Sequence, residues 1–217
     1  MVREHLARDE VDINTTDKDG SRAFHEACRR GHTEIVQLLL ERSDLDVNSK
    51  DKEGLTGLQL ACSKRHRKIV TLLTARDDID INAKDNGYSG LHYACGDGMI
   101  EIATLLLARK DLDINAKDQT GDTAFHCACT DGNVQIVELL IARDDLDVTT
   151  KDKMGKNAFY WACTEDEISQ EDLVNLGVQI CGKHNLHPSE LLADVDKPDL
   201  ELQITNMLAQ RKSARKQ

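Results

Sequence analysis

Apolar and polar positions follow one pattern that recurs along most of the chain. In the first full unit, a polar turn over 17–20 precedes a predicted short helix from Ala23 to Arg30, which Gly31 ends. A second predicted helix runs from Glu34 to Glu41, with Thr33 as its cap, and buries one apolar face. An alternating apolar and polar stretch then leads into the next unit, which is typical of an extended connection.

The same pair of residues marks every unit of this pattern. An Ala-Cys dipeptide recurs at spacings of 34, 33, 34 and 34 residues. Its copies are Ala27-Cys28, Ala61-Cys62, Ala94-Cys95, Ala128-Cys129 and Ala162-Cys163. A fixed period of this size indicates a repeat array. Because neither short helix buries enough apolar surface alone, we expect the core to form where successive units stack.

The order of motifs within each unit resembles the ankyrin repeat. A polar turn is followed by an L-H-x-A motif, a Gly-His pair, a V-x-x-L-L motif and an Asp-Val-Asn motif. The third unit is one residue short near Asn86-Gly87. The slot that holds proline in the family, at the start of the first helix, is occupied by Ala23, Gly57, Gly90, Ala124 and Ala158. Since proline presets a helix start, we expect these helices to begin less firmly.

The resemblance implies an all-α solenoid of stacked helix-turn-helix units with hairpin-like loops. We divide it into a partial repeat at 1–16, full repeats at 17–50, 51–84, 85–117 and 118–151, and a degenerate repeat at 152–185. Residues 186–217 are predicted to form a C-terminal helical cap and a basic tail. Helices should start near Pro188 and Pro198. The apolar face of the second one is Leu200, Ile204, Met207 and Leu208.

Cysteine and histidine recur with the repeat, which favours structural roles. Equivalent positions in stacked helices lie roughly 8–10 Å apart, whereas a disulfide needs Cα atoms within about 7 Å. The repeated cysteines are therefore predicted to be free and buried, and His25, His92 and His126 to form structural hydrogen bonds. No spacing matches a metal site and no catalytic group converges, so we predict no metal, cofactor or catalytic residue.

Charge and hydropathy narrow the class of partner. The 217 residues carry a formal net charge of −11 and no basic stripe runs through the repeats, so nucleic-acid binding is not expected. No apolar signal segment opens the chain and its apolar runs are short, which favours a cytoplasmic or nuclear protein without membrane insertion. We expect a monomer.

The basic end, 211–217, either contacts acidic lipid or nucleic acid or complements a helix C-terminus.

The connections between units are rich in Asp and Asn. The acidic residues are Asp44, Asp46, Asp77, Asp78, Asp80, Asp111, Asp113, Asp144, Asp145 and Asp147. They form either a surface for a basic partner or a solvated rim that keeps the stack soluble. By the resemblance, Asn48, Asn82 and Asn115 close the connections between repeats. Asn48 and Asn115, which follow a leucine eight residues earlier, also suit an asparaginyl hydroxylase.

Candidate partner contacts are the positions at which the repeats differ. The resemblance implies that hairpin tips and first helices line the concave face, which such arrays use for binding. At these positions the chain places Leu55, Leu60, Tyr88, Tyr93 and Trp161. Tyr and Trp are favoured interface anchors, and aromatic residues are only 3% of this chain. Alternatively, these side chains pack against adjacent turns or, for Trp161, beneath the cap.

The sequence therefore predicts a non-enzymatic module that binds a protein partner of unknown identity on its concave face. The alternative is a regulatory or targeting segment from a larger protein, and the partial unit at 1–16 favours a chain cut from a longer array. An enzyme in its own right is a third possibility, but no constellation of residues favours it.

Overall fold

The computed structural model describes residues 12–18, 20–164 and 167–214, so residues 1–11 of the partial repeat predicted at 1–16 lie outside the described residues. These residues form helices and no strand, in two compact units. Unit 1, up to residue 94 and at 101–113, holds α2 (Ala23–Arg30), α3 (Thr33–Leu40), α4 (Gly57–Ser63), α5 (Arg67–Thr74) and most of α6 (Gly90–Gly96) and α7 (Ile100–Leu107). Unit 2 holds α8 (Ala124–Thr130), α9 (Val134–Ala142), α10 (Ala158–Thr164), α11 (Gln170–His184), α12 (Pro188–Leu191) and α13 (Pro198–Ala214).

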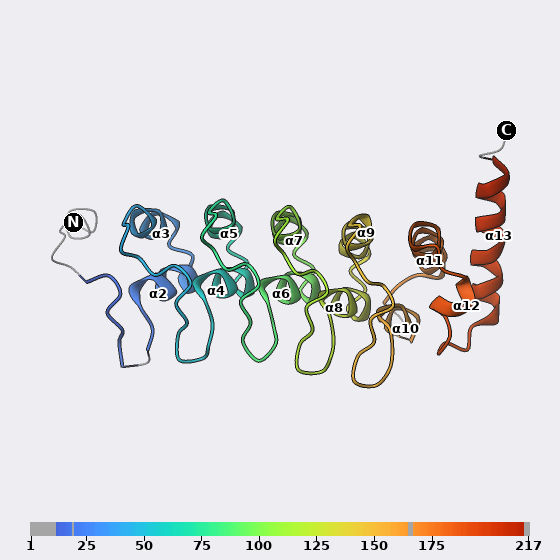
Figure 1. Cartoon of the computed structure of the whole chain (residues 1–217), viewed down its shortest axis with the longest axis horizontal. Coiled ribbons are helices and arrows are strands. Elements are labelled where there is room, and N and C mark those ends of the chain that lie inside the picture. The colour runs from blue at the N-terminus through green and yellow to red at the C-terminus, as the bar shows by residue number, and fades with distance from the viewer. Residues whose placement is uncertain (1–11, 19, 165–166, 215–217) are drawn as a thin grey trace. The chain divides into compact units, whose positions relative to one another are not determined.

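Within each unit the first helices of successive repeats lie in one row and the second helices in another (Figure 1). Hairpin-like loops precede the first helices, and each contains one isolated antiparallel bridge. The bridged pairs are Thr16 with Arg22, Lys50 with Thr56, Asp85 with Tyr88, Lys117 with Thr123, and Lys151 with Asn157. The predicted all-α repeat stack with hairpin-like loops is confirmed.

The core of each unit lies between its two rows of helices. Phe24, Phe125 and Phe159 are at most 1% exposed, and the five repeated cysteines at most 2%. All seven cysteines are free, including the five repeated ones for which this was predicted. Burial away from water raises the pKa of the repeated thiols well above its usual value, because it penalises the thiolate. They therefore act as small apolar side chains rather than as reactive ones.

The proline slot is the first residue of the first helix, and the residue before it supplies the cap. The hydroxyl of Thr56 accepts a hydrogen bond from the backbone of Gln59, whose side chain accepts one from the backbone of Thr56. Thr123 and His126 form the same reciprocal pair. These capping boxes satisfy N–H groups at the helix start. The two helices therefore have a defined beginning even though the proline is missing.

The turn between the two helices differs from the predicted one in a single respect. Gly31 does end α2, with a left-handed φ of 75°. Thr33, however, is the first residue of α3 and His32 occupies the cap position, so the prediction of Thr33 as cap is wrong. The Thr33 hydroxyl instead points back to the carbonyl of Gly31, at 3.5 Å.

Asparagine side chains join the connections of successive repeats. Asn48 donates from Nδ2 to the carbonyl of Asp78 at 2.7 Å and accepts from the N–H of Asp80 at 2.8 Å. Asn115 forms the same two bonds with Asp145 and Asp147, at 2.7 and 2.8 Å. Asn14 and Asn82 also make both contacts in unit 1. The structural role that the resemblance implies for these asparagines is confirmed.

Replacing one of these asparagines should loosen the stack. We expect Asn115→Ala to lower the free energy of unfolding by about 1–3 kcal/mol, since two backbone groups lose their partners. Chemical denaturation would measure the change. Gln135→Ala, an exposed polar residue on α9, is the matched control and should change it by less than about 0.5 kcal/mol. Equal values for the two variants would contradict a stabilising role for the asparagine.

The last two described helices follow the second helix of the fifth repeat. Helices begin at Pro188 and Pro198, as predicted, and α13 packs on α11. Leu200 and Ile204 are at most 1% exposed, while Met207 and Leu208 are half-buried. The second helix of the fifth repeat is longer than its counterparts, running over 15 residues in α11. Its length gives α13 a surface to cover.

Candidate functional site

The loop of the third repeat is built differently from the others. Asn86 and Gly87 both have left-handed φ values, 45° and 88°. Asp85 and Tyr88 exchange two backbone hydrogen bonds, at 2.7 and 3.1 Å, which closes a two-residue hairpin. Asn-Gly is the dipeptide that favours such a turn, because both central residues need positive φ. In the second repeat, by contrast, the N–H of Asp51 bonds to the carbonyl of Leu55, four residues on.

This tight hairpin presents an aromatic pair. Tyr88 is 39% exposed, and its ring centroid lies 5.6 Å from that of His92 and 5.6 Å from that of Tyr93. The Tyr93 hydroxyl donates to Oδ1 of Asp85 at 3.3 Å. Gln59 donates to the same oxygen at 3.0 Å and to the carbonyl of Tyr88 at 2.9 Å. The pair is therefore held by its own repeat and by the preceding one.

The other predicted contact residues fall in different surroundings. Leu55, in the preceding hairpin, is half-buried. Leu60 is only 2% exposed, so its side chain belongs to the core and is not available at the surface. Trp161 lies in unit 2, half-buried, with its indole N–H donating to Oδ2 of Asp152 at 2.8 Å and its ring edge-on to Tyr160. In unit 1, Leu55, Tyr88 and Tyr93 remain as surface candidates.

The environment of Tyr93 predicts a pH dependence. Desolvation by burial, followed by the nearby charge of Asp85, raises the pKa of Tyr93 from 10.0 to about 12. The unfolded chain releases the Tyr93 proton near pH 10, whereas the folded chain holds it up to a higher pH. The stability that the protonated Tyr93 contributes to the folded state is therefore present below pH 10 and is lost as the pH rises towards 12. The melting temperature should therefore fall over pH 10 to 12, and less steeply in Tyr93→Phe. Identical slopes for both proteins would contradict this effect.

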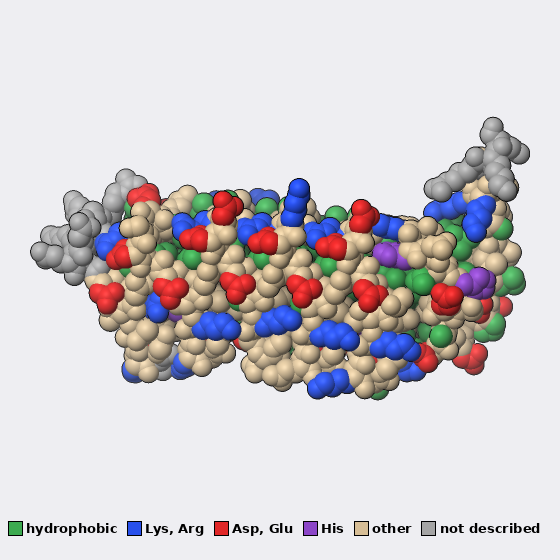
Figure 2. Space-filling model, viewed as in Figure 1, with side chains coloured by type: hydrophobic (Ala, Val, Ile, Leu, Met, Phe, Trp, Pro, Cys, Tyr) green, Lys and Arg blue, Asp and Glu red, His purple; other side chains and the backbone are tan. Residues whose placement is uncertain are grey.

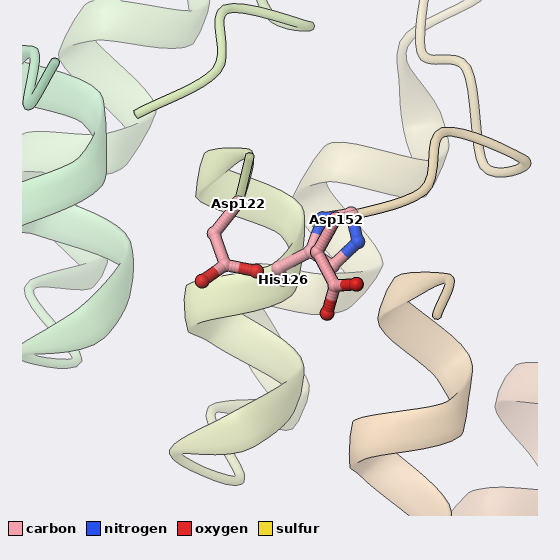
Figure 3. Close-up of side chains that lie close together, drawn as sticks. All are labelled: Asp122, His126 and Asp152. Carbon is pink, nitrogen blue, oxygen red and sulfur yellow. The ribbon is translucent and has the colours of Figure 1, made fainter. Parts of the chain in front are cut away.

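One cluster in unit 2 has the composition of a metal site. Asp122 and Asp152 extend from the hairpin loops on either side of α8 toward His126 on that helix (Figure 3). One ligand atom from each lies within 4.8 Å of the others. Zinc–nitrogen and zinc–oxygen bonds are about 2.0–2.2 Å, so two ligands of one zinc ion lie at most about 4.4 Å apart, and a limit of 4.8 Å does not by itself establish a metal site.

Hydrogen bonds already account for this convergence. Nδ1 of His126 accepts from the N–H of Thr123 at 3.2 Å, so Nε2 carries the proton and donates to the carbonyl of Lys156 at 3.2 Å. A protonated ring nitrogen offers no lone pair to a metal. Oδ2 of Asp152 accepts from the indole of Trp161. His25 likewise joins its helix start to the carbonyl of Ser49, which supports the predicted structural role of the histidines.

The acidic connections are partly neutralised by arginines two residues earlier. Ion pairs join Arg42 to Asp44, Arg76 to Asp78, Arg109 to Asp111 and Arg143 to Asp145, at 2.6–2.8 Å. Hydrogen bonds from these arginines hold the pKa of each paired aspartate below its usual value. Arg109 also donates to the carbonyls of Thr74 and Arg76 in the preceding connection. Figure 2 shows acidic and basic side chains recurring together, which favours the solvated rim over a purely acidic docking edge.

Comparison with known families agrees with this architecture. Two stretches, residues 1–85 and 86–179, match the model named ankyrin repeats (3 copies). The chain therefore belongs to the ankyrin-repeat family, whose members are generally protein-interaction modules and typically non-enzymatic. A search of curated proteins found no match. Among the described residues, no helix has both the length and the apolar character needed to cross a membrane.

Proposed function

We propose that this chain is a non-enzymatic module that binds a protein partner on the concave face of the array, centred on Tyr88 and Tyr93. The observation that carries the proposal is an exposed tyrosine on a closed two-residue hairpin, backed by a second tyrosine. A rigid aromatic side chain loses little conformational freedom on binding and supplies a large contact area, which is why Tyr is frequent among the residues that dominate interface energies.

The surroundings of the two rings support the same proposal. Asp85 and Gln59 fix the hairpin from below, so a partner would meet a surface whose shape is already formed. Leu55 adds a half-buried apolar neighbour from the preceding hairpin. An apolar centre with polar groups around it matches the usual anatomy of a protein interface.

Site-specific photo-crosslinking tests the proposal with an isolated partner. Tyr88→benzoylphenylalanine is expected to crosslink to the partner on irradiation. The matched control is Leu202→benzoylphenylalanine on α13, where the natural side chain is 58% exposed but lies far along the chain from the hairpin. A partner that crosslinks only from position 202 would place the interface elsewhere and overturn the proposal.

A further inference from the structure

The turn between α4 and α5 carries a compact basic run, Lys64-Arg65-His66-Arg67-Lys68, which we call the basic turn. All four of its Lys and Arg residues are exposed. His66 is half-buried, and its Nε2 lies 3.1 Å from the carbonyl oxygen of Arg29, at the end of α2. This contact holds the basic turn against the turn of the preceding repeat.

One backbone position of the basic turn is unusual for a residue with a side chain. Arg65 has a left-handed φ of 61°, a conformation that suits glycine and costs energy for any residue with a Cβ. The first, third and fourth repeats place Gly31, Gly98 and Gly132 at this point of the turn, with φ values of 65–75°. An arginine kept where glycine would remove the strain points to a role for its side chain.

The position of the basic turn at the start of α5 is also unfavourable for that helix. Arg67 and Lys68 are the first two residues of α5, where the helix dipole favours negative charge. No acidic residue stands in the first turn of this helix, whereas α3 and α7 carry Glu34 and Glu101 there. The positive end of α5 therefore adds to the four side-chain charges instead of offsetting them. Together they form a site of positive potential that attracts an anion.

We propose that the basic turn is a second docking site, which binds a short Asp- and Glu-rich segment of a protein partner. The remainder of the chain disfavours a nucleic acid or an anionic membrane. The net charge is −11, and the equivalent turns of unit 2 carry Asp97 and Asp131. A polyanion needs a continuous basic surface, but a short acidic segment needs only a few cations. The site is independent of the tyrosine pair, since α4 separates the basic turn from the hairpins.

A fluorescein-labelled hexaglutamate peptide is a suitable probe, with binding to the full chain followed by fluorescence anisotropy. Lys64→Gln with Arg67→Gln and Lys68→Gln should weaken binding about tenfold, the combined effect of three exposed ion pairs. The matched control, Lys18→Gln with Lys110→Gln and Lys153→Gln, removes the same charge from scattered exposed positions and should bind like the wild type. Raising the salt concentration should weaken wild-type binding.

A single substitution separates binding from stability. Arg65→Gly removes one charge and relieves the left-handed strain, so it should weaken binding while raising the melting midpoint by about 2–4 °C. A midpoint that falls instead would show that the arginine serves the fold, and would overturn the inference.

Other ligands and a further variant complete the test. Hexathymidylate and phosphatidylserine vesicles are offered to the same proteins. The inference is overturned if the peptide does not bind, if both triple variants bind it equally, or if either of these ligands binds the basic turn more tightly than the peptide. Tyr88→Ala should bind hexaglutamate as tightly as the wild type does. The peptide assay therefore tests the basic turn alone, and its outcome does not depend on whether the tyrosine pair binds a partner.

Discussion

Ile204→Asp is expected to lower the free energy of unfolding by more than about 3 kcal/mol. Ile204 is fully buried, and α13 approaches α11 so closely that a side chain on Gly177 would clash with the terminal carbon of Ile204. The same position would also meet the ring of Phe159 at 3.4 Å. A carboxylate at Ile204 would therefore lose the packing of α13 against the fifth repeat and would have to be buried or expelled with the helix.

The neighbouring Leu202 provides the control for this change. It lies on the same helix but is 58% exposed, so Leu202→Asp should alter stability by less than about 0.5 kcal/mol. Thermal and chemical denaturation of both variants would give the comparison. Deletion of residues 187–217 should have the same consequence as Ile204→Asp and also expose the apolar surface of α11, with aggregation as a second readout. If the truncated chain melts like the full one, the segment is not a cap.

The period of the array explains why so much of the fold could be predicted from the sequence. Each unit repeats a glycine in its hairpin, its Ala-Cys pair and its apolar stripe, so a weak signal in one unit is supported by the next. The helices that begin at Pro188 and Pro198 could be predicted from ordinary helix signals, with proline at the start and apolar residues on one face. These features depend on local sequence and on stacking of equivalent positions, both of which can be read from one chain.

The errors arose where neighbouring repeats determine the outcome. Leu60 and Tyr93 occupy the same repeat position, yet Leu60 is buried and Tyr93 is only half-buried. The apolar leucine side chain can be enclosed completely, whereas the Tyr93 hydroxyl bonds to Asp85. The basic turn could not be recognised as unusual from the sequence, because its distinguishing feature is the left-handed backbone conformation of Arg65. The hairpin at Asn86-Gly87 did have a signal, since the missing residue and the dipeptide together indicate a two-residue turn.

The effect of the two tyrosines on binding is expected to be the largest of any surface change in unit 1. Tyr88→Ala combined with Tyr93→Ala should weaken binding of an isolated partner by more than about 2 kcal/mol, or roughly thirtyfold in Kd. Tyr88 lies at the tip of the hairpin and contributes little to the core, whereas Tyr93 also loses its bond to Asp85. Titration calorimetry would give the affinity, and circular dichroism would show whether the helices are retained.

Two further variants separate the contribution of the rings from that of the fold. Tyr93→Phe keeps the ring and removes only the bond to Asp85, so it should retain most of the affinity if contact area is what matters. Met154→Ala truncates another exposed apolar side chain, 71% exposed in the fifth-repeat hairpin, and should leave Kd unchanged. If the folded double variant binds its partner as tightly as the wild type, then the tyrosine pair is not the interface. The acidic connections, whose arginine-paired carboxylates still face solvent, would then be the next surface to alter.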